Sequence, residues 1–287
     1  MKVFLLTLVP LLPVLVLAQS AQAPMPDVPT LLREVEEHQH ALDQVRENYT
    51  YHETTITHEL DKNGKIKKSS SEEAEVFFVN THEIRRKIKK DGKPLSSDEQ
   101  QKEQQRVQKA VEKAIKDPPG QSTYKNQVSV SRLLQLMKVS APRREQMDGR
   151  SVLVFDFTGD PHARTHGAEE AALKKISGTV WVDEQDRQVR RMTATFDDNF
   201  HLGFGLFSVG KGSRFTFDQK LINNELWLPT GAQIHLVAHA LGVLGWRGDV
   251  QITDDDYQKF HVDASQQSGA TVVHESGRRP PERRPSE

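Results

Sequence analysis

The chain has 287 residues with 40 acidic side chains, 39 basic side chains and no cysteine. The near balance of charge argues against a protein that binds nucleic acid through its overall field. The missing cysteines exclude disulfide scaffolds, thiolate metal sites, a cysteine nucleophile and lipid attachment at an N-terminal cysteine. Hydrophobic residues make up 36% of the chain, which predicts a core that is thin for this length.

The first residues are typical of a secretory signal. A basic Met1-Lys2 start is followed by an apolar run at 3–18 that two prolines interrupt. The run is too short, and too disturbed by proline, for a comfortable membrane span. Small residues follow, so we expect a signal peptide at 1–20 with cleavage between 20 and 23. The mature protein is then exported, with a periplasmic location; an uncleaved anchor is the alternative.

The first half of the chain predicts helices and a strand meander. One helix is expected at about 30–47, because apolar residues recur there at steps of three and four. Strands rich in β-branched and aromatic residues are expected at 49–60, 65–79 and 82–90. Ser96 and Glu99 have the spacing of a capping box and predict a polar helix to about Lys116, and a short amphipathic helix is expected at about 129–139.

The second half predicts an antiparallel meander. The expected strands are 150–159, 176–183, 187–197, 213–221, 225–238 and 243–252, with turn residues between them. Twelve of the fifteen Phe and Trp residues lie after position 150, so the main core is expected there. The polar segment 264–287 is expected to be a disordered tail.

These elements predict an α+β fold that is mainly β. The expected architecture is a large curved antiparallel sheet, an unclosed β-barrel of about ten strands, with helices covering the concave face. The domain is expected to span 30–262, with a helical insertion at about 96–140. Such a half-barrel encloses a cavity if the helices do not fill it.

A glycine-rich segment resembles a phosphate-binding loop only superficially. Gly205 to Ser213 contains a Gly-Lys pair, but Gly212 stands where a phosphate loop has Ser or Thr. The residues that follow alternate like a strand and do not open a helix. We therefore interpret the glycines as bends or a hairpin tip, and the neighbouring apolar residues as a ligand-contacting loop.

Histidine and carboxylate clusters give no strong metal signal. His235 and His239 fall in an alternating strand about 13 Å apart at roughly 3.3 Å per residue, too far for one metal ion. His162 and His166 lie in a predicted loop and suggest at most an opportunistic surface site. The carboxylate clusters at 197–199 and 254–256 are interpreted as solvated turns at strand ends, with calcium binding as the alternative.

Residues 62–116 contain fifteen Lys and Arg against nine acidic residues. This local excess suggests either a face that approaches anionic lipid or an acidic partner, or solvated strand and helix faces. Solvated faces are the simpler interpretation.

Three stretches carry a resemblance to a known family. They are Gly178-Thr-Val-Trp181-Val-Asp183 with the strand that follows it, Glu225-Leu-Trp227-Leu-Pro229-Thr, and Asp256-Tyr257 with Lys259 and Phe260. Their order, behind a signal peptide and an opening helix, resembles outer-membrane lipoprotein-sorting proteins of the Lol-type periplasmic lipoprotein-carrier superfamily. The helical insertion at 96–140, the glycine segment and the long tail depart from the compact carriers.

The resemblance implies a non-catalytic protein that holds acyl chains in an apolar cavity under a helical lid, without metal or cofactor. Our first hypothesis is therefore a periplasmic carrier of lipoprotein acyl chains or another apolar ligand. Its partner is then a lipidated protein or other apolar molecule, with no nucleic acid partner, and the protein is not integral to the membrane. An envelope regulatory module that binds a membrane protein is the second hypothesis, and an exported hydrolase is the third.

Aromatic and large apolar residues of the second half are the predicted ligand contacts: Trp181, Trp227, Trp246, Phe204, Leu206 and Phe207. For each tryptophan the alternative is ordinary core packing.

Overall fold

The computed structural model describes residues 24–118, 132, 135–202, 207–240 and 244–259, apart from the side chains of 39–44, 169, 202, 207, 240 and 244. The proposed signal peptide, the predicted tail, the segment 119–131 and residues 203–206 and 241–243 lie outside the described residues. Among the helices that are described, none is long and apolar enough to cross a membrane.

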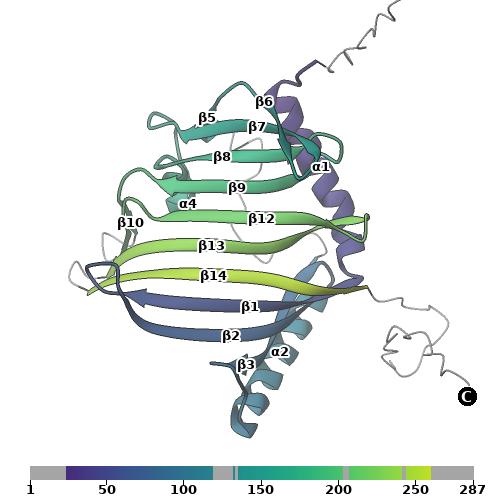
Figure 1. The fold of residues 1–287 in the computed structure, drawn as a ribbon, viewed down its shortest axis with the longest axis vertical. Coiled ribbons are helices and arrows are strands. Elements are labelled where there is room, and N and C mark those ends of the chain that lie inside the picture. The colour runs from purple at the N-terminus through teal and green to yellow at the C-terminus, as the bar shows by residue number, and fades with distance from the viewer. Residues whose placement is uncertain (1–23, 119–131, 133–134, 203–206, 241–243, 260–287) are drawn as a thin grey trace, which may run out of the picture.

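One antiparallel sheet of fourteen strands dominates the fold (Figure 1). The strands are β1 (Tyr49–Leu60), β2 (Ile66–Val79), β3 (His82–Lys90), β4 (Lys93–Pro94), β5 (Met137–Val139), β6 (Arg143–Met147), β7 (Arg150–Gly159), β8 (Ile176–Asp183), β9 (Val189–Phe196), β10 (Phe200–Leu202), β11 (Phe207–Val209), β12 (Arg214–Ile222), β13 (Leu226–Ala240) and β14 (Leu244–Lys259). The helices are α1 (Val28–Arg46), α2 (Ser97–Lys116) and α4 (Gly167–Leu173).

The strand order is β4-β3-β2-β1-β14-β13-β12-β9-β8-β7-β5, so the sheet has two ends and does not close. The mainly β, α+β prediction is confirmed, although fourteen strands replace the expected ten or so. The difference comes from five short strands, which are too brief to show a periodic pattern.

The pairing register separates an apolar face from a polar one. One row across the sheet runs through Phe155, Val180, Met192, Phe217, Ala232 and Ile252. The row beside it, on the opposite face, runs through Asp156, Thr179, Thr193, Thr216, Gln233 and Gln251. Because side chains alternate along a strand, each strand presents its apolar residues on one face only. We call these the inner face and the outer face.

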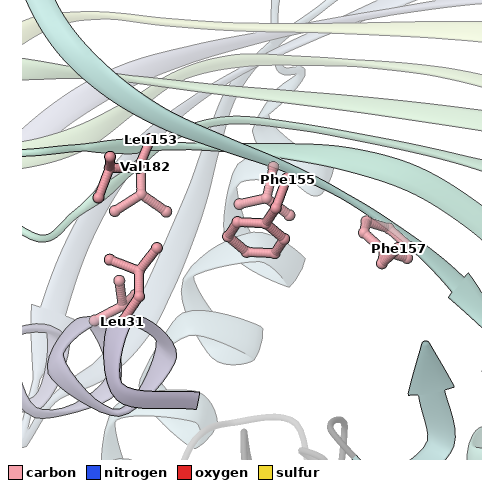
Figure 2. Close-up of a cluster of buried hydrophobic side chains, with 7 residues drawn as sticks. Leu31, Leu153, Phe155, Phe157 and Val182 are labelled. Carbon is pink, nitrogen blue, oxygen red and sulfur yellow. The ribbon is translucent and has the colours of Figure 1, made fainter. Parts of the chain in front are cut away.

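Helix α1 packs against the inner face. Asp27 caps it by accepting hydrogen bonds from the backbone N–H of Thr30 at 2.8 Å and from its hydroxyl at 2.9 Å. Leu31 and Val35, one turn apart, are buried in a cluster with residues of β7 and β8 (Figure 2). That cluster contains Leu31, Val35, Leu153, Phe155, Phe157, Val180 and Val182. The helix therefore covers the end of the inner face that β7 and β8 form.

A second buried cluster lies near the C-terminal end of α1. It consists of Tyr49, Leu226 and Leu228, with Val45 of the helix packed against it. The hydroxyl of Tyr49 also donates to Glu225 at 2.9 Å. One helix thus contacts two separate cores, the first on β7 and β8 and the second on β1 and β13.

Helix α2 covers the free edge of β3. Its capping box is formed as predicted, with Ser96 and Glu99 each bonded to the other's backbone N–H. Glu103 accepts a hydrogen bond from the backbone N–H of Lys87 at 2.7 Å, and Arg106 donates to the backbone oxygen of Arg85. These side chains occupy backbone groups that an exposed edge strand would offer to another chain.

Two predictions about local structure are wrong. The helix predicted to end at Val139 stops earlier, because Met137–Val139 forms β5 beside the end of β7. The strand predicted to end at 252 continues to Lys259, so the triplet 254–256 lies within β14 and not in a turn. In both places the local composition was misleading, because pairing with a neighbouring strand determines the backbone conformation.

Gly178 is required by close packing on the inner face. A Cβ at this position would lie 1.9 Å from the backbone oxygen of Thr193 and 2.6 Å from the ring of Phe157. We expect Gly178→Ala to destabilise the protein by about 1–3 kcal/mol, since strand or ring must move. Urea denaturation measures this. Gly245→Ala is the control, because its nearest non-adjacent atom, in His239, is 3.4 Å away; an equal loss in both variants would contradict the packing argument.

Candidate ligand-binding face

A half-buried apolar surface extends along the inner face beyond the first core. We call it the inner stripe, and its members are Met192, Ala194, Phe215, Phe217, Ala232, Ile234, Val250 and Ile252. Met192 and Ala194 pack against the first core, whereas the other six belong to neither buried cluster of the described residues. The rings of Phe215 and Phe217 stack with centroids 6.3 Å apart and an interplanar angle of 10°.

The dimensions of the inner stripe suit an acyl chain. It crosses four neighbouring strands, β9, β12, β13 and β14. Three steps of about 4.8 Å give a width of roughly 14 Å. One leaflet of a bilayer has an apolar thickness of about 15 Å, half of the ~30 Å hydrocarbon core. A single extended acyl chain of ordinary length therefore matches the stripe.

The inner stripe ends in acidic residues on β1 and β14. Glu53 and Asp254 are direct partners across these strands and are only 7% and 8% exposed. Arg85 forms an ion pair with Glu53. The rings of Tyr51 and Tyr257 lie beside them, with centroids 5.2 Å apart.

A bulge brings Tyr257 to this cluster. His52 pairs with Asp255 and Thr50 pairs with Gln258, so β14 has one more residue than β1 between these pairs. Asp256 takes up the extra residue with a φ of 49°, in the left-handed region that Asp tolerates better than most residues. Without the bulge, strict alternation would place Tyr257 on the opposite face from Asp254.

Burial raises the pKa of Asp254 to about 6, and the charges of Glu83 and Asp255 add to the rise while Arg85 opposes it. The native state then binds more protons than the unfolded state between about pH 4 and pH 6. Stability contributed by this group is present below about pH 4 and falls as the pH rises through 6. The loss amounts to about 3 kcal/mol at neutral pH, at 1.36 kcal/mol per pKa unit.

We therefore expect Asp254→Asn to raise the melting temperature at pH 7.5 by about 5–10 °C and to leave it almost unchanged at pH 4. The reason is that Asn removes the buried charge and keeps the shape. Thermal unfolding followed by circular dichroism at both pH values measures this. Asp255→Asn is the matched control, because Asp255 is exposed. A melting temperature at pH 7.5 that falls in Asp254→Asn would contradict the argument.

Of the predicted contact residues, the structure describes the side chains of the three tryptophans, and these lie in different surroundings. Trp246 lies opposite Ala238, on the inner face, with its indole over Gly248. Trp181 alternates with Val180 and Val182 of the first core and so lies on the opposite face from that core. Trp227 pairs with Leu221, four residues beyond Phe217 of the stripe, and lies in the charged network described below. Phe204 and Leu206 lie outside the described residues, and for Phe207 only the backbone, in β11, is described.

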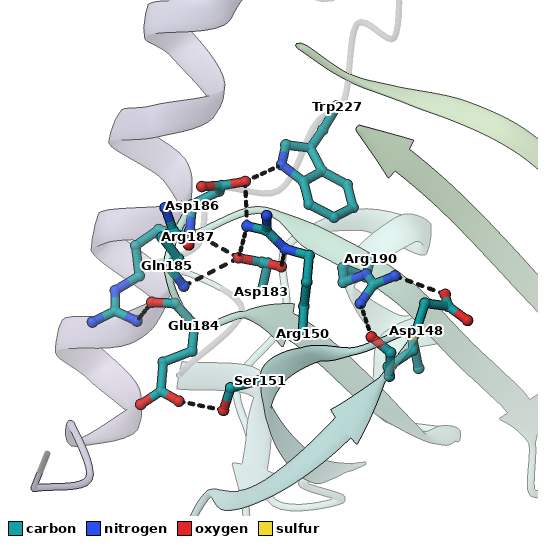
Figure 3. A network of polar contacts seen from close by, with 11 residues as sticks. Asp148, Arg150, Ser151, Asp183, Glu184, Gln185, Asp186, Arg187, Arg190 and Trp227 are labelled. Atoms are coloured by element: carbon teal, nitrogen blue, oxygen red, sulfur yellow. Dashed lines mark hydrogen bonds and ion pairs between the residues drawn. The ribbon is translucent and has the colours of Figure 1, made fainter. Parts of the chain in front are cut away.

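Trp227 belongs to a network of charged residues at the β8–β9 turn (Figure 3). The indole is 3% exposed, lies between the guanidinium groups of Arg150 and Arg190 at 5.7 and 5.3 Å from its centroid, and donates to Asp186 at 2.9 Å. Arg150 also holds Asp183 through two hydrogen bonds of 2.6 and 2.8 Å. We assign Trp227 a structural role, because the single polar group of its indole, the N–H, already donates to Asp186.

The same network ties the turn to α1. Arg187 donates to Glu34 of the helix at 2.7 Å. A pocket of about 460 Å³ lies beside it, lined by His38, Arg150, Gln188, Leu221 and Glu225 among others. A second pocket of about 280 Å³ is lined mainly by polar residues of β9, β12, β13 and β14, including Arg191 and Asp218. The first pocket is lined by polar and apolar residues alike, and the second is lined mainly by polar residues but borders Ala232 and Ile252 of the stripe.

The other motifs have structural partners. His235 contacts Asp249 through its Nδ1 at 2.6 Å, and His166 contacts Arg132 at 3.1 Å. The residues after Gly212 form β12, so the strand interpretation of the glycine segment is confirmed there. Within the described parts of the chain, no three His, Asp or Glu side chains are grouped in a way that could hold a metal ion.

The missed residues carried a readable signal. Phe215 and Phe217 alternate with polar residues, and so do Ile234, Val250 and Ile252. A period of two with apolar residues on one side is the pattern of a half-exposed strand. The alternating apolar residues, and not the largest side chains, are therefore the sequence signal that identifies the inner stripe.

Comparison with known proteins gives structural matches only. No family model matches the sequence, and neither does any curated protein. A LolA superfamily protein from Nitrosomonas europaea matches 83% of this chain and 95% of its own, with 11% identity and a TM-score of 0.33. An outer membrane lipoprotein-sorting protein domain from Vibrio parahaemolyticus matches 82% and 93%, with 10% identity and a TM-score of 0.34.

The complex of MucA and MucB from Pseudomonas aeruginosa also matches, covering 80% of this chain and 100% of that one at 8% identity and a TM-score of 0.23. Structures of the superfamily that the residues resemble are therefore among the matches. Identities near 10% and these scores do not establish a shared function.

Proposed function

We propose that this protein binds an acyl chain or a similar apolar ligand on the inner stripe and carries it without catalysis. The observation that supports this most directly is the row of half-buried apolar side chains across β12, β13 and β14, which joins neither buried core. The register of the sheet separates polar residues from apolar ones. Apolar side chains that no buried core covers are typical of a binding surface.

Burial of methylene groups supplies the binding free energy. Each buried CH₂ is worth about 0.8 kcal/mol, so a chain of ten carbons provides up to about 8 kcal/mol before the cost of association. The polar outer face would offer the same chain no comparable gain. Affinity is therefore expected to rise with chain length up to the width of the stripe.

The proposal also covers the cellular location of the protein and the shape of its sheet. The apolar N-terminal run acts as a cleaved signal, so the carrier works in the periplasm, where a lipidated protein is its natural cargo. In this proposal the open sheet acts as an unclosed barrel with helices over its concave face, and it is supported by the contacts of α1 with the buried clusters on β7–β8 and on β1 and β13.

The test is organic extraction of the full chain purified from the native envelope, followed by mass spectrometry. A stoichiometric acylated species is expected. An extract without one, together with a membrane protein that co-purifies, would contradict the carrier and favour the regulatory alternative. Titration of the ligand-free protein with 1-decanol by calorimetry checks that apolar binding needs no other component.

A further inference from the structure

The acidic cluster at the end of the inner stripe brings four carboxylates close together. The groups that face Asp254 are Glu53 of β1, Glu83 and Arg85 of β3, and Asp255 of its own strand. Arg85 pairs with Glu53. The hydroxyl of Tyr51 donates to Glu83 at 3.5 Å, and Arg46 of α1 acts on Glu83 electrostatically.

Two oxygen atoms in this cluster are buried without a hydrogen-bond partner among the described residues. They are the Oδ1 atom of Asp254 and the hydroxyl oxygen of Tyr257. Asp254 is 8% exposed, so water does not compensate for its charge. A buried ionised carboxylate without a partner is costly, and a protein keeps one where something else supplies the counter-charge.

The cluster is adjacent to the inner stripe. Asp254 follows Ile252 by two residues on the same face, a distance of about 7 Å at 3.4 Å per residue. Glu53 stands in the same relation to Thr55, which pairs with Ile252. An apolar chain on the stripe would therefore place its head group beside Asp254.

We infer that the cluster is a subsite for a protonated amine, so that the ligand is an amphiphile with a cationic amine beside its apolar chain. This rests on the proposed binding of apolar ligands to the stripe. A primary ammonium group has three N–H donors and one positive charge. Its donors and charge match the two oxygen atoms, Asp254 Oδ1 and the Tyr257 hydroxyl, that lack a hydrogen-bond partner among the described residues. An alcohol supplies a donor but no charge, and a carboxylate would be repelled.

The experiment compares three ligands with the same ten-carbon chain. Decylamine, 1-decanol and decanoate are titrated into the full ligand-free protein at pH 7.5 by calorimetry, below their micelle concentrations. Decylamine is expected to bind at least tenfold more tightly than 1-decanol, and decanoate more weakly than both. In Asp254→Asn the preference for the amine is expected to disappear while the affinity for 1-decanol is retained.

Asp255→Asn is the matched control, because it removes a neighbouring but exposed carboxylate and should keep the preference. The unmodified protein gives a second readout: lowering the pH from 7.5 to 5 protonates Asp254 and should reduce the preference, although the amine stays charged.

Equal affinity for all three ligands would overturn the amine subsite and leave the apolar site intact. A preference that survives in Asp254→Asn would overturn it as well, since the charge would then act elsewhere. Failure of all three ligands to bind would overturn the proposed function and this inference with it.

Discussion

Replacing Ile234 with Asp should weaken the binding of 1-decanol at least tenfold while the protein stays folded. The side chain lies in the middle of the inner stripe, between Phe215 and Val250 on the neighbouring strands. A carboxylate there would lose its water when the chain binds, and this cost opposes binding. A tenfold change corresponds to 1.4 kcal/mol, so calorimetry resolves it easily.

The matched control is Gln233→Asp. It introduces the same charge one residue earlier, on the exposed outer face. Its affinity for 1-decanol should equal that of the unmodified protein. If both variants lose binding equally, or neither does, the inner stripe is not the binding surface. Circular dichroism of both variants separates loss of binding from loss of fold.

Asp183→Ala should cost about 3–5 kcal/mol of stability, the largest effect expected of a single substitution here. The carboxylate is fully buried and accepts hydrogen bonds from Arg150 at 2.6 and 2.8 Å and from two backbone N–H groups of its own turn, at 2.9 and 3.1 Å. Burial alone would raise the pKa of Asp183, but the bonds from Arg150 and the backbone outweigh it and hold the pKa below its usual value.

The melting temperature of Asp183→Ala is therefore expected to fall by roughly 6–20 °C. Asp218→Ala is the control, because Asp218 pairs with Arg191 at 2.6 Å on the surface, where an ion pair contributes at most about 1 kcal/mol. Similar losses in the two variants would contradict the structural role of the buried turn. Binding of 1-decanol by folded Asp183→Ala should persist, since Asp183 lies away from the inner stripe.

Much of the fold could be predicted because its long elements carry strong patterns. All nine long strands were expected within a few residues, apart from the end of β14, and Ser96 with Glu99 correctly marked the start of α2. The short strands β4, β5, β6, β10 and β11 were not expected individually, because two to five residues cannot show a period.

The candidate site was harder to predict because it depends on which strands become neighbours. Glu53 and Asp254 are 201 positions apart, and only the pairing of β1 with β14 places them side by side. Asp254 was expected in a solvated turn, since three consecutive aspartates are typical of loops. Asp254 instead alternates with Ile252 on the inner face, and the bulge at Asp256 brings Tyr257 to the same face.

The pairing of β1 with β14 also sets an order of events for the chain. The first strand can pair with β2, which follows it in the sequence, but its pairing with β14 must wait for the last strand, and α1 makes its contacts with strands from the second half of the sequence. The bond between Tyr49 and Glu225 spans 176 positions. Such distant contacts make folding slow and prevent an N-terminal portion from completing the sheet alone. We therefore expect the sheet to be completed only once β14, the last strand of the chain, is available to pair with β1.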